Sequence, residues 1–278
     1  MAIQPRLIAT DLDGTLLRTD GSVSPRTAAV LARLTRQGRQ VVLVTGRPIR
    51  WLQQVYDQLH EPLPAICANG AVIYDPLEDE VVRANPLSPE LLGQVARRLR
   101  AAVPGVSFAV EVTDGREMWH ETGYPVHRAD IGVRLVDAPE ELLSAPAVKL
   151  LARARGQDPD AFVEIVSGAL QGLAEATHSS YSGLVEISAA GVTKAAGLAW
   201  FGAQHGLSAQ DAVAFGDMPN DLPMLTWAGR AVAMANAHPA VRQIADDVAL
   251  SNDEDGVAAY LEQLFGPVPV PAAGRPED

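Results

Sequence analysis

Three short, strongly apolar segments constrain the fold more than any other feature of the sequence. They begin at Leu7 (LIAT), Val41 (VVLV) and Ala212 (AVAFG), and a polar residue follows each of them. Continuous apolar runs rich in β-branched residues are typical of strands buried on both faces of a parallel sheet. Helix-like segments follow these runs, the first starting at Ser24-Pro25, a capping hydroxyl before a proline. The pattern predicts an α/β fold, a Rossmann-like parallel sheet with helices on both faces.

The alternation of strands and helices is interrupted in the middle of the chain. From about Arg83 strand-like segments run together with only two helical segments among them, and the alternation resumes near Gly191. Such a run is typical of an α+β unit, which here would be inserted into the α/β sheet as a cap domain. The predicted divisions are an α/β core domain (1–82 and 189–266), an α+β cap domain (83–188) and a Pro-rich, disordered tail (267–278).

The net charge limits the kinds of partner that the protein is expected to bind. The formal charge is −12, and this argues against nucleic acid or an anionic membrane as a partner, because both need a basic surface. The single cysteine, Cys67, permits neither an intrachain disulfide nor a cysteine-based zinc cluster. No apolar run is long enough to cross a bilayer, and no signal-peptide pattern is present. We therefore expect a cytoplasmic protein, either a monomer or a homodimer.

The polar residues after the apolar runs are of a kind that can bind a hard cation. Because the carboxyl ends of parallel strands meet at one edge of a sheet, these residues are expected to converge, with Lys194 at a helix start close to them. Oxygen ligands without cysteine or clustered histidine favour Mg²⁺ over zinc. The residues in question are Asp11, Asp13, Thr45, Asp217 and Asp221.

Each of these residues also has an ordinary structural interpretation. Asp11 and Asp13 point the same way on an extended backbone, and their repulsion requires a cation or a shared proton. Alone, they could form a metal site, an acid/base pair or an acidic turn, the last being commonest for a bare Asp-x-Asp. Thr45 could be a helix cap and Lys194 a solvated lysine. Taken together, a cation, an anion site and a free carboxylate predict phosphoryl transfer with a carboxylate nucleophile.

Four segments in this order resemble the four motifs of the haloacid dehalogenase-like phosphatases. The cap inserted before the motif lysine is similar to that of the Cof-type branch, which further short segments also match. The four motif segments are Asp11-Leu12-Asp13-Gly14-Thr15, Thr45-Gly46-Arg47, Gly191-Val192-Thr193-Lys194 and Gly216-Asp217-Met218-Pro219-Asn220-Asp221. The further segments are Asn69-Gly70-Ala71, Met234-Ala235-Asn236-Ala237 and Asp255-Gly256-Val257.

The resemblance implies a role for each catalytic residue. Asp11 would be the nucleophile that takes the phosphoryl group, and it would also bind Mg²⁺. Asp13 would be the general acid and then the general base, and its backbone carbonyl would bind Mg²⁺. Lys194 would neutralise the developing charge. Asp217 would be a metal ligand, with Asp221 in the metal's coordination shell or directly behind it.

The resemblance also implies a phosphate site and a substrate class. Thr45, the Gly46 amide and Asn220 would contact phosphate, and Arg47 would either reach substrate or pair with a nearby acid. The implied activity is Mg²⁺-dependent hydrolysis of a small phosphorylated metabolite. A sugar phosphate is the first expectation, and nucleotides or flavin precursors come second. A sugar phosphomutase and a non-catalytic phospho-ligand sensor are the alternatives. Candidate cap contacts to substrate are Met118, Trp119, His120, Tyr124 and His127.

Overall fold

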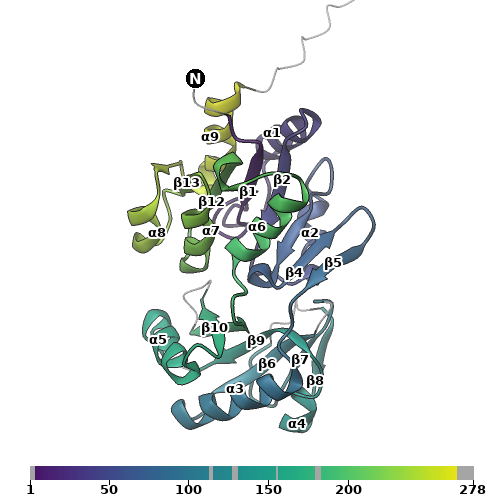
Figure 1. Cartoon of the computed structure of the whole chain (residues 1–278), viewed down its shortest axis with the longest axis vertical. Helices are drawn as coiled ribbons and strands as arrows, with labels where there is room; N and C mark the ends of the chain where they lie inside the picture. The colour runs from purple at the N-terminus through teal and green to yellow at the C-terminus, as the bar shows by residue number, and fades with distance from the viewer. Residues whose placement is uncertain (1–3, 113–114, 127–130, 155, 179–182, 268–278) are drawn as a thin grey trace, which may run out of the picture.

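The computed structural model describes residues 4–267 except 113–114, 127–130, 155 and 179–182. Two β-sheets lie one beyond the other along the long axis of the molecule, and the chain passes from the first to the second and back (Figure 1). His127 and the part of the predicted tail from residue 268 onward lie outside the described residues. We call the eight-stranded sheet the core sheet and the six-stranded sheet the cap sheet.

The core sheet has the strand order β14-β13-β12-β1-β2-β3-β4-β5. Strands β14 to β3 are parallel, with Leu7 paired to Ala212 on one side and to Gln40 on the other, whereas β4 and β5 are antiparallel additions. The strands are β1 (Leu7–Thr10), β2 (Gln40–Val44), β3 (Ala65–Cys67), β4 (Val72–Asp75), β5 (Glu80–Ala84), β12 (Ala212–Gly216), β13 (Arg230–Ala233) and β14 (Asp247–Val248).

Helices cover both faces of the core sheet, because the crossovers on the two sides of β1 run in opposite directions. Helix α1 packs against α9, and α6 packs against α7. The Ser24 hydroxyl starts α1 by accepting the Thr27 N–H at 3.0 Å. The helices are α1 (Pro25–Arg36), η1 (Ile49–Trp51), α2 (Gln53–Tyr56), η2 (Ala68–Gly70), α6 (Lys194–Gln204), η3 (Ala209–Asp211), η4 (Pro219–Asp221), α7 (Leu222–Trp227), α8 (Pro239–Ile244), η5 (Asn252–Glu254) and α9 (Gly256–Phe265).

One helix is shorter than its sequence predicts. The spacing of apolar residues from Pro48 to Leu59 indicates one continuous helix, but the chain forms the short η1 and then α2. The first turn of this segment contacts the cap domain. The Arg50 N–H donates to the Gly115 carbonyl at 3.4 Å, and the Arg50 side chain forms an ion pair with Glu111 of the cap sheet.

The cap sheet has the order β10-β11-β9-β6-β7-β8 and is antiparallel except between β7 and β8. Strand β8 and helix α4 were not expected, because the region around them is rich in polar residues and proline. The strands are β6 (Ser107–Val112), β7 (Met118–His120), β8 (Val133–Leu135), β9 (Ala147–Arg153), β10 (Ala174–Thr177) and β11 (Leu184–Ala189), and the helices are α3 (Pro89–Ala102), α4 (Pro139–Leu142) and α5 (Pro159–Leu170).

The two faces of the cap sheet have different neighbours. One face packs on α3 and α5 in a hydrophobic cluster that includes Phe108, Leu150 and Val185. Since side chains alternate along a strand, Lys149 and Leu151 of β9 belong to the opposite face, and both line a cavity shared with the core. The predicted fold class, a parallel-sheet α/β core with an inserted α+β cap, is confirmed. The exact domain boundaries, at 82/83 and 188/189, stay predictions.

Candidate active site

Four of the expected residues come together at the carboxyl edge of β1 and β12. Asp11 directly follows β1, and its N–H donates to the Phe215 carbonyl of β12 at 3.0 Å. Asp217 directly follows β12, and Asp221 ends η4. Each of the three aspartates offers a carboxylate oxygen, and these oxygens lie within 4.8 Å of one another. The topology therefore brings together acids that are some 200 residues apart in the chain.

Lys194 lies between two of these carboxylates. Its ammonium donates to Asp11 Oδ1 at 2.6 Å and to Asp221 Oδ1 at 2.6 Å, and the side chain has no exposed surface. The other oxygen of Asp221 accepts the backbone N–H groups of Asp217 and Met218, at 2.9 and 3.0 Å. Asp221 therefore ties Lys194 to the loop after β12 and lies deeper in the protein than Asp11 or Asp217.

Three buried carboxylates surround the single ammonium of Lys194. This excess of negative charge helps to raise the pKa values of Asp11 and Asp217. Burial raises the pKa of Asp11 well above its usual range, and the charges of Asp221 and Asp217 raise it further against the opposing effect of Lys194. Burial and Asp221 raise the pKa of Asp217 to about 7. For Lys194, burial alone would lower the pKa, but the two neighbouring carboxylates raise it instead. The cluster is therefore deficient in positive charge.

A divalent cation that prefers oxygen ligands would supply the missing positive charge. Asp11, Asp217 and Asp221 present only carboxylate oxygens, which are the ligands that Mg²⁺ prefers in proteins. A second positive charge beside Lys194 would also favour the ionised forms of Asp11 and Asp217. The donor set therefore agrees with the Mg²⁺ that the sequence predicts.

The backbone of two loops is shaped around the acids. A Cβ on Gly14 would lie 2.3 Å from Asp217 Oδ2, and Gly14 has a φ of 77° that favours glycine. A Cβ on Gly216 would lie 2.6 Å from the Cβ of Asp221. The Thr15 hydroxyl donates to Asp217 Oδ1 at 2.8 Å. The glycines in the first and fourth motifs therefore allow a close approach between the loops.

Asp13 lies outside the buried carboxylate cluster. Its side chain is 57% exposed, and its two oxygens accept from Arg47 Nε at 2.7 Å and from a terminal nitrogen of Arg47 at 2.5 Å. Of the two alternatives for Arg47, the structure shows the pairing with a nearby acid. Asp13 and Arg47 both line the cavity that Asp11 also lines.

The predicted phosphate-binding residues lie around the same point. Gly46 and Asn220 line the cavity, while Thr45 is fully buried behind them. The Thr45 hydroxyl accepts the Arg47 N–H at 3.0 Å, which orders the turn after β2. Asn220 donates to Asn69 Oδ1 at 3.1 Å, and its own Oδ1 is buried without a hydrogen-bond partner among the described residues.

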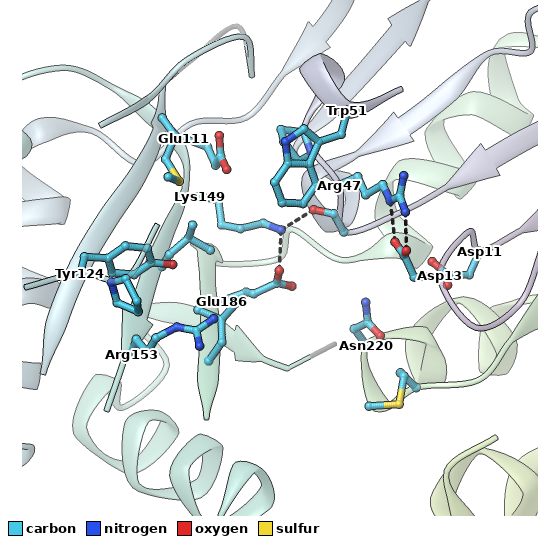
Figure 2. A pocket seen from close by; sticks show the side chains of 17 residues that line it. Asp11, Asp13, Arg47, Trp51, Glu111, Tyr124, Lys149, Arg153, Glu186 and Asn220 are labelled. Carbon is cyan, nitrogen blue, oxygen red and sulfur yellow. Dashed lines mark hydrogen bonds and ion pairs between the residues drawn. The ribbon is translucent and has the colours of Figure 1, made fainter. Parts of the chain in front are cut away.

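The cavity has a volume of about 370 Å³ and lies between the core sheet and the cap sheet. Figure 2 shows Asp11 and Asp13 at one end of the view and Tyr124 and Arg153 at the other. Of the candidate cap contacts, Met118 and Tyr124 line the cavity, whereas Trp119 and His120 are not among its lining residues.

Four charged cap residues that line the cavity were not expected, namely Arg153 at the end of β9 and the three described next. Glu111, Lys149 and Glu186 lie on β6, β9 and β11, and each is nearly fully buried. The signal was present in the sequence, because Lys149 and Glu186 interrupt strands that are otherwise almost entirely apolar. A charged residue inside such a strand needs a partner, and sequence alone does not show which sheet face it occupies.

Comparison with known proteins identifies the family. A sequence model of the haloacid dehalogenase-like hydrolases matches residues 8–261. The chain belongs to this family, as the four motifs predict, and the resemblance to its Cof-type branch is confirmed. Within the family, the predicted enzyme class, a phosphoric monoester hydrolase, is confirmed by relatives that are named phosphatases.

Two such relatives are similar to the chain over nearly its whole length. The 5-amino-6-(5-phospho-D-ribitylamino)uracil phosphatase YitU of Bacillus subtilis is 30% identical over 95% of this chain and 99% of its own. The pyridoxal phosphate phosphatase YbhA of Escherichia coli is 31% identical over 92% of this chain and 97% of its own.

Solved structures agree with this assignment. A haloacid dehalogenase-like hydrolase from B. subtilis has a TM-score of 0.81 at 25% identity and covers 94% of this chain and 100% of its own. Another from Bacteroides thetaiotaomicron has a TM-score of 0.74 at 27% identity, covering 93% and 99%. Within the described part of the chain, no helix has the length and apolar character needed to span a membrane.

Proposed function

We propose that the chain hydrolyses a small phosphomonoester through an aspartyl-phosphate on Asp11, with Mg²⁺ as cofactor. The observation that supports this most directly is the placement of Asp11. Its carboxylate belongs to the buried cluster with Asp217 and Asp221, and the residue also lines the cavity. It is therefore the member of the cluster that can reach both a cation and a substrate phosphorus.

In the first step, an oxygen of Asp11 attacks phosphorus, and the bond from phosphorus to the leaving alcohol breaks. Attack requires the ionised carboxylate, and the Lys194 ammonium at 2.6 Å stabilises that form. Gly46 and Asn220, which line the cavity beside Asp11, would hold the phosphoryl oxygens. Lys194 itself is fully buried and acts through Asp11 and Asp221, so it would orient the nucleophile.

Asp13 would move the protons in both steps. It would give a proton to the leaving alcohol, then take one from the water that hydrolyses the aspartyl-phosphate. To carry a proton it must be released from the Arg47 guanidinium, which holds both of its oxygens in this structure. A bound phosphate dianion offers Arg47 an alternative partner of higher charge. Substrate binding would therefore free Asp13 for its role.

Mg²⁺ would be held by Asp11 and Asp217, with Asp221 directly behind, and by the Asp13 backbone carbonyl. When bound, it supplies positive charge to the phosphoryl group and to the crowded carboxylates. Sugar phosphates were the first substrate expectation, and the two relatives described above act on phosphate esters of ring-containing molecules according to their names. The predicted cytoplasmic location and oligomeric state stay predictions.

The nucleophile assignment is tested with Asp11→Asn and Asp13→Asn. We expect Asp11→Asn to fold and to lose about a thousandfold or more in kcat on an aryl phosphate. With the same aryl phosphate, whose leaving group needs no proton from Asp13, Asp13→Asn should accumulate a phosphorylated protein, because the hydrolytic water lacks its base. Intact-mass spectrometry after rapid quenching detects this species. The matched control is Asp20→Asn, which changes an exposed acid in the loop after the first motif and should behave as the wild type.

Near-normal turnover by Asp11→Asn would refute the nucleophile role, as would phosphate found on another residue. A requirement for a bisphosphate activator, with transfer to a sugar in place of water, would indicate the phosphomutase alternative.

A further inference from the structure

Asn69, a buried residue that the proposed mechanism does not use, lies where the cap meets the core. It belongs to η2 and has a φ of 56°, a left-handed conformation that asparagine adopts more readily than most residues. Its Nδ2 donates to Glu186 Oε2 of the cap strand β11 at 2.7 Å. Its Oδ1 accepts from Asn220 Nδ2 of the core at 3.1 Å. The Asn69 side chain therefore connects a charged cap residue to a residue of the predicted phosphate site.

This chain of bonds fixes which atom each amide turns to its neighbour. Lys149 Nζ, which can only donate, lies 3.0 Å from Glu186 Oε1. The Glu186 carboxylate can only accept, so Asn69 must turn its Nδ2 to it and its Oδ1 to Asn220. Asn220 must then present its Nδ2, which carries a second N–H besides the one that Asn69 accepts. The cap charges therefore give Asn220 a donor, and not a carbonyl oxygen, at this point.

The same residues hold the backbone of Gly46. The Asn69 N–H donates to the Thr45 carbonyl at 3.0 Å, and a trans peptide directs the Gly46 N–H to the opposite side. Lys149 donates to the Gly46 carbonyl at 2.6 Å. A Cβ on Gly46 would lie 3.1 Å from Asn69 Oδ1 and 3.4 Å from Glu186 Oε2, so the side chains pack directly on this peptide. Both predicted phosphate donors are thus held by one set of contacts.

Burial and charge make these contacts suited to an anion site. Asn69, Lys149 and Glu186 are each nearly fully buried, so their bonds are protected from competing water. A lone carboxylate here would repel phosphate, but the Lys149 ammonium compensates the charge of Glu186. Figure 2 shows the pair on the cap side and Asn220 across the cavity from it. The pair can therefore orient donors without adding net negative charge.

We propose that Asn69, Glu186 and Lys149 form a positioning network, which directs the N–H groups of Gly46 and Asn220 to the phosphate of the substrate. Glu186 and Lys149 belong to the cap, so the donors are held in place while the cap lies on the core. Cap docking and phosphate binding then favour one another. This inference rests on the proposed phosphatase activity and adds a role of the cap in binding the phosphate itself, whatever the leaving group.

Glu186→Gln tests the network with almost no change of shape. Lys149 would hold the oxygen of the introduced amide, so its NH₂ would face Asn69 and reverse the chain of bonds. We expect the Kd of inorganic phosphate for the Mg²⁺-loaded protein, measured by isothermal titration calorimetry, to rise by about tenfold. The value of kcat/KM for an aryl phosphate should fall by about the same factor. Thermal unfolding shows whether the variant is folded.

A second substitution shows whether Glu186 acts through Asn220. In protein that already carries Asn220→Ala, Glu186→Gln should change the phosphate Kd by about threefold or less, because the end of the chain is missing. Adding Asn69→Asp to Glu186→Gln should recover about threefold or more, since a carboxylate accepts from both the introduced amide and Asn220. If Glu186→Gln does not fold, Asn69→Gly replaces it. Glycine retains the left-handed backbone and removes only the side chain, so the same rise in Kd is expected.

Two further glutamates of the cap provide controls. Glu111→Gln breaks another buried ion pair between cap and core, the one with Arg50. Its effect on phosphate binding should be the same with and without Asn220→Ala, because Glu111 is not bonded to Asn69. Glu164→Gln changes an exposed residue of α5 and should behave as the wild type.

The outcomes separate this inference from the proposed function. If the wild type binds phosphate but hydrolyses no ester, the proposed function fails, and the calorimetric comparison still decides on the network. If folded Glu186→Gln binds phosphate as the wild type does, or if its effect simply adds to that of Asn220→Ala, the network is overturned even though hydrolysis continues. A wild type that binds no phosphate at millimolar concentration overturns it too.

Discussion

At the scale of single residues, the site depends on a small number of charges held at short range. Asp11 and Asp221 share the buried ammonium of Lys194, while the exposed Asp13 is held by Arg47. The two aspartates of the first motif are separated by one residue, yet one is buried in the cluster and the other faces solvent. This difference in burial fits the proposed roles, Asp11 as the nucleophile and Asp13 as the acid that moves protons.

Arg47 gives a prediction at this scale. Arg47→Gln should lower kcat/KM by about tenfold or more, because a charge-assisted bond to the phosphate is lost. Arg47→Lys should recover part of the loss, since it restores the charge but not the two-bond geometry. Steady-state kinetics measure both effects.

The free energy of unfolding provides the matched readout for Arg47. Because Asp13 is largely exposed, losing the pair should change this free energy by about 1 kcal/mol or less, measured by urea denaturation. Unchanged kinetics together with a larger loss of stability would show that Arg47 has only a structural role.

At the scale of elements, two loops after neighbouring parallel strands build the site. The loop after β1 carries Asp11 to Thr15, and the loop after β12 carries Asp217 to Asp221. The Thr15 hydroxyl bonds to Asp217, and Asn236 donates to the Gly14 carbonyl at 2.8 Å from the loop after β13. The loops therefore hold one another in position, and a change of backbone in one should move the acids of the other.

Gly14→Ala tests this coupling. A Cβ would collide with Asp217 and would also require a φ of 77°, so we expect a loss of about 2–3 kcal/mol in stability and most of the activity. The matched control is Gly21→Ala, since Gly21 has a φ of 82° but no atom of the described residues within 4 Å of the place a Cβ would take. It should cost only the backbone strain, about 1 kcal/mol. Equal effects of the two substitutions on kcat would contradict the coupling.

At the scale of the whole molecule, the core sheet and the cap sheet close around one cavity. Charged groups join them, Arg50 with Glu111 and Lys149 with the Gly46 carbonyl. The core carries the carboxylate cluster, and the cap contributes most of the far wall of the cavity. Neither sheet alone forms the cavity, so selection of a substrate depends on their association.

Mg²⁺ should change the stability of the whole protein in a pH-dependent way. The raised pKa values of Asp11 and Asp217, the latter about 7, mean that the folded metal-free protein binds protons more tightly than the unfolded chain. Their stabilising contribution is therefore complete at acidic pH and is lost as the pH rises through about 7. We expect Mg²⁺ to raise the melting temperature by about 5 °C near pH 8 and by less near pH 5.5, where protons compete with it.

Differential scanning fluorimetry with and without a chelator measures this effect. Asp217→Asn should reduce both the Mg²⁺ response and the part of the pH dependence that comes from this group, whereas Asp57→Asn, which changes an exposed acid away from the cluster, should retain both. A full Mg²⁺ response in Asp217→Asn would show that the cation binds elsewhere.

Much of the core fold and site could be predicted from local pattern. Apolar runs of strand length, such as Val41 to Val44, specify buried parallel strands, and parallel strands bring their carboxyl ends to one edge. The convergence of Asp11 and Asp217 follows from that rule. The motifs then indicated the family, because their order and spacing encode the same topology.

The tertiary structure alone decided which partner each charged side chain has and which side chains line the cavity. No local pattern shows that Arg47 pairs with Asp13, that Arg50 pairs with Glu111, or that Lys149 bonds to the Gly46 carbonyl. These contacts depend on the face that each cap strand turns to the core and on the way the sheets close. The sequence by itself determined which polar residues meet at the strand ends, whereas the lining of the cavity depends on contacts between segments far apart in the chain.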